Sequence, residues 1–129
     1  MSDKFIVEII TPEKSILRAE VIEVNIPSYE GQMGILKDHI PLITFLRPGL
    51  IIAESREGKK KYYVEEGTVE FSNNNLLILT STARDVDDLN KSYVENLLNQ
   101  AESKLSEVNS DKEKYLISYK ISTLKEISQ

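Results

Sequence analysis

Short apolar runs separated by turn-forming residues make up the first 84 residues of the chain. Each run has the length of a β-strand, and within 21–27 the apolar Val24 and Ile26 alternate with polar residues, as a half-buried strand requires. Between these runs lie Glu57-Gly58, Glu66-Gly67 and Asn73-Asn74, where glycine and asparagine tolerate the positive φ of tight hairpin turns. The pattern predicts a small antiparallel sandwich or barrel. Its runs are 5–10, 21–27, 41–46, 49–55, 60–66, 68–71 and 76–82.

Beyond residue 84 the period changes from that of a strand to that of a helix. Apolar residues recur at steps of three or four, which predicts one helix of about 22 residues with a single apolar stripe. Asp85, Asp87 and Asp88 lie at its start, where carboxylates accept hydrogen bonds from free N–H groups and favour the positive end of the dipole. The stripe consists of Leu89, Tyr93, Leu97, Ala101, Leu105 and Val108.

A second helix begins after a short polar interruption. Ser110 and Glu113 have the spacing of a capping box, and Leu116, Tyr119 and Thr123 begin the apolar face that follows. Two helices joined by so short a loop run antiparallel. The chain is thus expected to divide into a β-domain over 1–84 and a helical hairpin over 85–129. Because the hairpin has few apolar residues for its length, we expect it to need a surface on which to dock.

Composition excludes several classes of function. The 129 residues contain no cysteine, which removes disulfides, thiolate metal sites and cysteine nucleophiles and fits a reducing compartment. The formal net charge of −5 argues against nucleic acid as a partner, because phosphate binding uses clustered Lys and Arg. No run approaches the length of a membrane span and the first residues lack the pattern of a signal peptide, so we expect a soluble protein that is not secreted by that route.

The segment 27–42, PSYEGQMGILKDHIPL, concentrates the unusual residues of the chain. It holds two of the five glycines, two of the four prolines and the only histidine. A single His39 without a carboxylate at helical spacing does not make a metal cluster, so a structural role for this residue is favoured over a base or a ligand. The GQMG within the segment matches the GxxG of KH domains, but that loop joins two helices and this one lies between strand-like runs.

Other polar clusters have an ordinary structural interpretation beside the chemical one. The adjacent carboxylates of Asp87 and Asp88 suit a helix start better than a cation site. The basic run 56–64, REGKKKYYV, could contact anionic lipid or an acidic partner. The commoner role of lysines on an exposed strand is to prevent edge pairing with another chain. Since no catalytic constellation, metal-ligand set or cofactor motif is found, we expect no catalytic residues, no metal, no cofactor and no enzymatic activity in this chain alone.

Several motifs taken together resemble the ε subunit family of the rotary ATP synthases, which includes the mitochondrial δ subunit. The family has a GxxGxxGILPGHAPLIT segment, then L.PG, a double glycine before a strand, and ILAD.A. This chain has YEGQMGILKDHIPLITFLRPGL over 29–50, YYVEEGTVEF over 62–71 and LLILTSTARDVDDL over 76–89, in the same order. Lys37 and Asp38 replace the residues before the histidine, and Glu66 replaces one glycine.

The resemblance implies a β-sandwich of about ten antiparallel strands followed by the two-helix hairpin. It implies a non-catalytic rotor subunit in the central stalk of a proton-translocating ATP synthase, peripheral on the cytoplasmic face of the bacterial inner membrane. Its partners would be the γ subunit along one sandwich face, the ring of c subunits, and the α/β catalytic head through the C-terminal helices. The segment 27–42 would be the docking loop for the ring, with contacts from Tyr29, Glu30, Gly31, Gln32 and His39.

The hairpin leaves a second function open. Some relatives bind ATP through an (I/L)DxxRA motif, and the matching residues 86–91 here keep Asp87 but have Asn90 and Lys91 in place of arginine and alanine. Loss of the arginine removes the fork that would hold a phosphate, so Asp87 is only a weak candidate for ATP binding. A nucleotide-sensing regulatory module is therefore the alternative to the rotor subunit, and a ligand-binding sandwich with a deep pocket is a third hypothesis.

Overall fold

The computed structural model of the protein describes residues 3–128. Over this range the chain forms ten β-strands, one short 3-10 helix and two α-helices, as the sequence predicts for the β-sandwich and the hairpin. The strands are β1 (Phe5–Ile10), β2 (Ser15–Val21), β3 (Glu23–Ser28), β4 (Gly31–Leu36), β5 (Leu42–Leu46), β6 (Gly49–Ser55), β7 (Gly58–Val64), β8 (Gly67–Ser72), β9 (Asn75–Leu79) and β10 (Ala83–Asp85). The helices are η1 (Val86–Asp88), α1 (Lys91–Leu105) and α2 (Asp111–Ile127).

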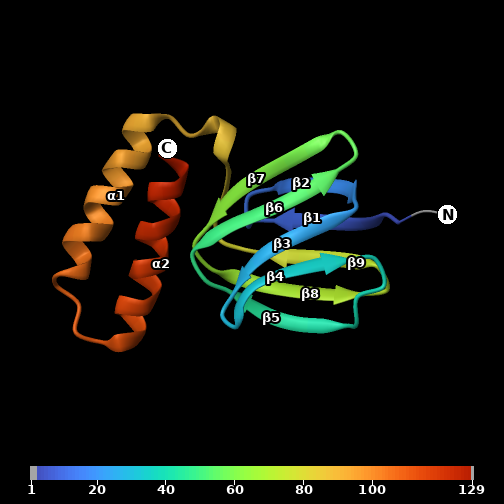
Figure 1. Ribbon diagram of the computed structural model, residues 1–129, viewed down its shortest axis with the longest axis horizontal. Helices are drawn as coiled ribbons and strands as arrows, with labels where there is room; N and C mark the ends of the chain where they lie inside the picture. The colour runs from blue at the N-terminus through green and yellow to red at the C-terminus, as the bar shows by residue number, and fades with distance from the viewer. Residues whose placement is uncertain (1–2, 129) are drawn as a thin grey trace.

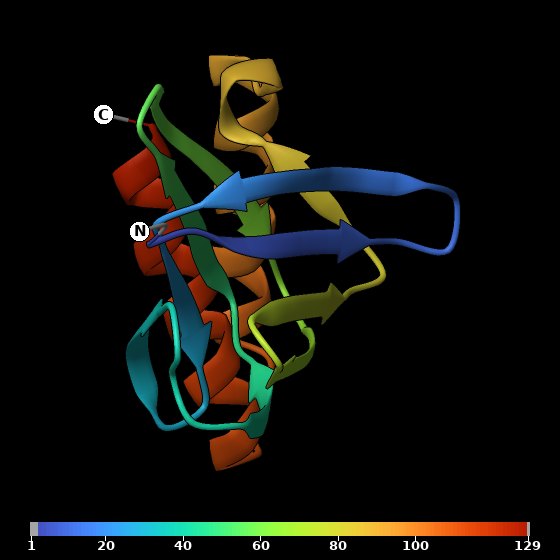
Figure 2. The same cartoon turned by 90° about the vertical axis from the view of Figure 1, so that its right-hand side faces the viewer.

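The strands form one continuous sheet that folds over on itself as a sandwich (Figure 1). Its order is β10-β7-β6-β3-β5-β8-β9-β1-β2, and β4 pairs with β3 beside this path. Figure 2 shows the β1–β2 hairpin and β9 in front of the strands that lie against the helices. The prediction that all strands are antiparallel is wrong for one pair, because β1 runs parallel to β9. Parallel pairing requires a long connection, and here most of the sandwich lies between the two strands.

Alternating apolar residues of facing strands fill the space between the two layers. On β1, Phe5, Val7 and Ile9 are buried while the residues between them are half-buried. The Phe5 ring meets Phe71 edge-on, with ring centroids 5.7 Å apart. The Asn73-Asn74 pair has φ of 51° and 58°, which confirms the predicted tight turn between β8 and β9.

Three strands occupy regions where the apolar pattern predicted none: β2, β4 and the short β10, which follows the run 76–82. β2 is mostly polar on its exposed positions, and β4 contains two glycines, so neither shows a clear apolar alternation. The segment 27–42 is therefore not a single loop as we expected. It is the end of β3, a turn, the whole of β4 and the connection to β5.

The first helix is shorter than the prediction and starts later. Asp85 caps η1 by accepting the Asp87 N–H, and the side chain of Asn90 caps α1 by accepting the Tyr93 N–H. The early aspartates thus belong to a separate 3-10 turn, and α1 has 15 residues. The second cap is confirmed, because the Ser110 hydroxyl accepts the Glu113 N–H at 3.0 Å.

The helical hairpin lies against β6 and β7 (Figure 1). A small apolar cluster joins the two parts, with Leu50 and Tyr63 from the sheet and Val94 and Leu124 from the helices. Leu124 has no exposed surface at all. The hairpin therefore has the docking surface that its thin apolar face requires.

Candidate docking surfaces

The β3–β4 turn presents Tyr29 and Glu30 at one end of the sandwich. Fully buried Ser28 donates its hydroxyl to the carbonyl oxygen of Gly31 across the turn at 2.7 Å. Gly31 has a φ of 127°, which a side chain would strain. The side chains of Tyr29 and Glu30 are exposed, and so is that of Gln32 on the adjoining part of β4. These residues, 29–32, form one continuous surface that we call the turn surface.

Backbone hydrogen bonds from the neighbouring strand fix the turn surface in place. The Tyr29 N–H donates to the carbonyl of Phe45 at 3.1 Å, and the Arg47 N–H donates to the carbonyl of Pro27 at 2.9 Å. Both bonds join residues 27–29 to the segment 45–47 at the end of β5, which holds the turn in place. A braced turn presents its side chains in a defined geometry, as a docking surface requires.

His39 lies at the opposite end of β4 from the turn surface. Its ring Nδ1 and the carbonyl oxygen of Ile40 are 2.7 Å apart, and the ring meets Phe71 edge-on at 6.0 Å between centroids. The six residues of β4 separate it from the turn by about 20 Å. The structure therefore brings Tyr29, Glu30, Gly31 and Gln32 together but leaves His39 apart from them.

The outer face of β5, β8, β9 and β1 carries exposed apolar side chains. Phe45 pairs with Thr68, Thr68 with Leu79, and Leu79 with Ile10, so these residues form a row across four strands about 14 Å wide. Phe45 is 58% exposed, Leu79 44%, and Ile43, two residues along β5 on the same face, 77%. We call Ile10, Ile43, Phe45 and Leu79 the apolar face.

Sequence reasoning did not find the apolar face, although a signal for it was present. The segments 42–46 and 76–79 are apolar at nearly every position, so both faces of these strands carry apolar side chains. Such strands are usually covered on both sides. Grouped apolar side chains left in contact with water mark an interaction surface.

Aromatic side chains connect the turn surface with the docked hairpin. The Tyr29 ring stacks on Tyr115 of α2, with centroids 6.3 Å apart and 10° between the planes, and the Tyr115 hydroxyl donates to the Tyr29 carbonyl at 3.3 Å. Tyr115 meets Tyr119 edge-on at 4.8 Å. The guanidinium carbon of Arg47 lies 3.7 Å from the centre of the Tyr119 ring. The turn surface and the hairpin thus share one contact region.

A polar contact ties the hairpin to the sheet on the same side. Lys120 Nζ lies 3.0 Å from a Glu65 carboxylate oxygen, and the buried Tyr63 donates its hydroxyl to the same carboxylate at 2.9 Å. Burial raises the pKa of Tyr63, and the neighbouring Glu65 carboxylate raises it further. Tyr63 therefore stays protonated at any ordinary pH.

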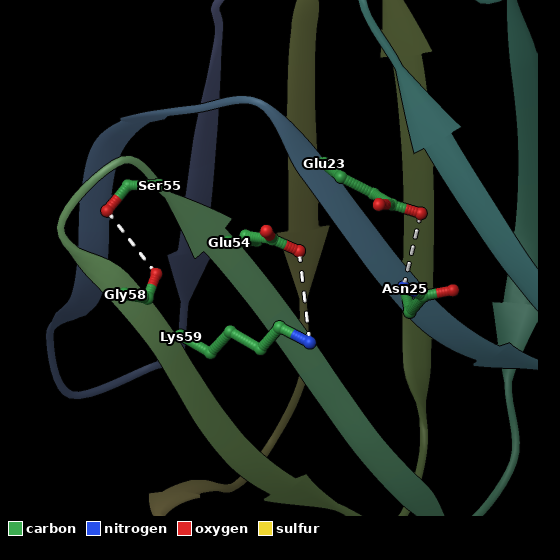
Figure 3. A network of polar contacts seen from close by, with 6 residues as sticks. All are labelled: Glu23, Asn25, Glu54, Ser55, Gly58 and Lys59. Carbon is green, nitrogen blue, oxygen red and sulfur yellow. Dashed lines mark hydrogen bonds and ion pairs between the residues drawn. The ribbon is translucent and has the colours of Figure 1, made fainter.

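Basic side chains of the run 56–64 approach carboxylates within the β-domain. Figure 3 shows Lys59 extending across the β6–β7 hairpin toward Glu54, with 4.0 Å between Nζ and the carboxylate oxygen. Lys60 approaches Asp85 at 3.9 Å, and the Arg56 guanidinium approaches Asp3 at 3.4 Å. The first two contacts join paired strands, whereas Arg56 lies in the β6–β7 turn and Asp3 precedes β1. These three basic side chains therefore have acidic partners within the β-domain.

Asp87 lies in η1 with an exposed side chain, and its N–H donates to the Asp85 carboxylate at 2.9 Å. Between residues 3 and 128 there is no group of three or more carboxylate or histidine side chains placed to hold a metal ion. Over the same range, no helix has the length and apolar character needed to cross a membrane.

Comparison with known proteins identifies the family. Residues 4–86 match the family model for the β-sandwich domain of the ATP synthase delta/epsilon chain. The chain is 50% identical to the ATP synthase epsilon chain of Pelagibacter ubique over 131 residues, which cover 99% of this chain and 100% of that one. The chain belongs to the ATP synthase delta/epsilon family. The prediction made from the motifs is confirmed, and the chain is an accessory subunit of ATP synthase.

A second relative agrees with this chain in length, and two solved structures share its fold. The ATP synthase epsilon chain of Rhizobium rhizogenes is 31% identical, with 99% of this chain and 96% of that one covered. A chain in the OSCP/F1/c-ring structure of the Euglena gracilis mitochondrial ATP synthase aligns with a TM-score of 0.82 at 19% identity, covering 100% of this chain and 84% of that one. A chain in the central stalk/c-ring structure of the Tetrahymena thermophila mitochondrial ATP synthase aligns with a TM-score of 0.63 at 14% identity, covering 96% of each chain. The similarity in fold therefore extends over the hairpin.

Proposed function

We propose that this family member is a non-catalytic rotor subunit in the central stalk of a proton-translocating ATP synthase. It would couple rotation of the c ring to the γ subunit and so to the catalytic head. Full-length identity of 50% to an ATP synthase epsilon chain supports the assignment. So does a fold shared with chains in c-ring and central-stalk assemblies.

The exposed apolar face is the observation that carries the assignment of partners. Ile43 and Phe45 are more than half exposed on β5, and Leu79 and Ile10 lie on the same face beyond Thr68 of β8, which leaves several apolar side chains of one face in water. Burial of such side chains against a second protein is favourable at about 25 cal/mol per Å². We assign this face to the γ subunit, because a flat sheet face suits a broad, torque-bearing contact.

We assign the turn surface to the c ring. Tyr29, Glu30 and Gln32 combine one aromatic with two polar groups on a braced turn, which fits the polar loops of a partner. Gly31 permits the turn itself. His39 lies about 20 Å away along β4 and has its own contacts with Ile40 and Phe71, so we place it outside this surface.

The two parts of the chain would have different roles. Residues 1–84 would hold both partner surfaces, while 85–129 would form the regulatory hairpin that can also reach the α/β head. The hairpin is docked through Leu124 and Val94. Asp87 stands exposed in η1 with its N–H on the Asp85 carboxylate, and Asn90 stands in place of the arginine of the ATP-binding motif. The rotor function is therefore favoured over the nucleotide-sensing module.

Catalysis has no part in this proposal. The ring of the single histidine, His39, lies against the carbonyl oxygen of Ile40 and against Phe71, so among residues 3–128 it is not paired with a nucleophile. The chain would be peripheral to the membrane, held at the cytoplasmic face of a bacterial inner membrane through the c ring.

Charge substitution on the apolar face tests the γ assignment. The Phe45→Asp variant should bind purified γ subunit at least about tenfold more weakly, because a carboxylate in the contact would be desolvated. The matched control is Leu36→Asp, since Leu36 is 56% exposed on β4, outside the apolar face. Equal binding by the two variants in a pull-down or by calorimetry would exclude this face as the γ contact.

Charge substitution at the turn surface tests the c-ring assignment separately. The Glu30→Lys and Gln32→Glu variants should bind γ normally but lose binding of the γ complex to reconstituted c rings. Glu57→Lys is the matched control, because Glu57 is exposed in the β6–β7 turn, away from both the turn surface and the apolar face. Normal binding of the turn variants to c rings would show that the ring meets another part of the chain.

A further inference from the structure

A cleft between α2 and the β3–β6 side of the sheet contains a buried arginine. The cleft has a volume of about 440 Å³. Its sheet side carries Arg47, Leu50 and Ile52, and its helix side carries Tyr119 and Ser122. The side chains that line it are therefore partly apolar, with the Arg47 guanidinium as the single cationic group among them.

The environment of Arg47 is unusual for a charged side chain. The residue is only 8% exposed, and its guanidinium carbon lies 3.7 Å from the centre of the Tyr119 ring. Its Nε is buried without a hydrogen-bond partner. Within residues 3–128 no carboxylate forms an ion pair with it.

A buried guanidinium of this kind can bind an anion. Charges taken out of water are usually paired or hydrogen-bonded, and Arg47 has only the face of Tyr119. Stacking on a ring leaves the edge of the guanidinium, with its N–H donors, free to bind two oxygens in one plane. The missing partner is thus a planar oxyanion at the edge of the stack.

The other charges near the cleft limit the size of that anion. Glu126 also lines the cleft, seven residues after Tyr119 and so about 10 Å away along the helix axis. The nearby Lys120 is already paired with Glu65. A second negative charge on the ligand would be repelled by Glu126, so a monoanion fits better than a phosphate dianion.

We propose that Arg47 and Tyr119 form a binding site for a single carboxylate in the cleft between α2 and the sheet. The carboxylate binds the edge of the Arg47 guanidinium, and the attached carbon chain lies against Leu50 and Ile52. Both a free small carboxylic acid and an acidic side chain of a protein have this chemistry. The site does not depend on the rotor function proposed above.

Titration of the full chain with propionate, followed by NMR, tests the site. The Arg47 Nε–H and the backbone N–H groups of Ser122 and Thr123 should shift along a saturable curve, with a dissociation constant on the order of 10 mM. Sodium chloride at the same ionic strength should give no such curve. Inorganic phosphate should bind more weakly than propionate, and tighter binding of phosphate would overturn the carboxylate assignment.

Two pairs of variants separate the site from general charge effects. Arg47→Gln should weaken propionate binding at least about tenfold, whereas Arg56→Gln, which removes an equal charge from an exposed arginine, should bind as the natural protein does. Ser122→Trp fills the cleft without changing Arg47 and should also abolish binding. Because Ser122 is exposed on α2, this variant tests the site even if Arg47→Gln does not fold.

The outcomes decide the proposal and the source of the carboxylate. Saturable binding that is lost in Arg47→Gln and Ser122→Trp but kept in Arg56→Gln supports the site. Binding that persists in Arg47→Gln, or that chloride reproduces, overturns it. Glutamate with both backbone groups blocked serves as the second ligand, and tighter binding of this compound than of propionate indicates an acidic protein side chain as the natural occupant. Equal binding indicates that a free carboxylate suffices.

Discussion

Replacement of Leu124 by alanine should release the helical hairpin from the sheet. Leu124 is completely buried in a cluster with only three other buried residues, Leu50, Tyr63 and Val94. Removal of a buried leucine side chain costs the transfer free energy of the lost atoms plus a term for the cavity, about 3 kcal/mol at such a site. Because each 1.36 kcal/mol is a factor of ten, opening of the hairpin should become about 150-fold more frequent.

Native-state amide exchange measures this opening directly. Helices of 15 and 17 residues have little stability in water when they are isolated, so the amides of α1 and α2 lose protection when the hairpin leaves the sheet. In Leu124→Ala these amides should exchange about 150-fold faster under conditions where exchange is limited by the opening equilibrium.

The matched variant is Leu76→Ala, which removes the same atoms from the sandwich core. Leu76 is 1% exposed on β9, far from the helices in the sheet order. Leu76→Ala should accelerate amide exchange in the sandwich. The amides of α1 and α2 should keep their rates, because the substitution destabilises the protein equally whether the hairpin is docked or released. Equal acceleration of the helices in Leu76→Ala, or less than about tenfold in Leu124→Ala, would refute the separate release of the hairpin.

Three further changes test local features of the fold. Ser110→Ala should lower the stability of α2 by about 1 kcal/mol, seen as faster exchange of its first amides, whereas Ser118→Ala on the exposed face of α2 should not. Gly67→Ala should cost about 2 kcal/mol more in urea unfolding than Gly58→Ala. Both glycines have positive φ, but only at Gly67 would a Cβ lie 2.6 Å from the Leu79 carbonyl oxygen, and equal costs would contradict this reason. Because the pKa of Tyr63 is raised in the folded chain, the unfolded chain ionises first, and the free energy of unfolding should fall above about pH 10. In the Tyr63→Phe variant, urea unfolding at about pH 9 and about pH 11 should show a smaller fall. An unchanged fall would exclude Tyr63 as its source.

The local elements of this fold could be predicted because their signals are local. The buried Val7 and Ile9 alternate with half-buried neighbours on β1, the Asn73-Asn74 turn needs two residues that accept positive φ, and the Ser110 cap needs an oxygen at one position. The strands β2 and β4 were missed for the same reason. Neither carries the apolar alternation on which the prediction depends, and β4 is formed mainly by its pairing with β3.

The candidate surfaces were harder to predict than the strands. Tyr29, Glu30 and Gln32 are close in sequence and stay together on one turn, so a motif could indicate them. His39 belongs to the same sequence segment, yet a six-residue strand carries it to the other end of the sheet. The residues of the apolar face come from three strands that are distant in sequence.

The sequence by itself determined the class of fold, the position of the change from strands to helices, the family and the turn that carries Tyr29. Periodicity, turn residues and caps depend on neighbours within a few positions, so they can be recognised in the chain alone. Only the tertiary structure decided that β1 runs parallel to β9, that Phe45 and Leu79 share a face, and that Arg47 lies on Tyr119 without an anion. Each of these facts joins segments more than 30 residues apart, and the pairing of distant segments depends on how the whole sheet closes around its core.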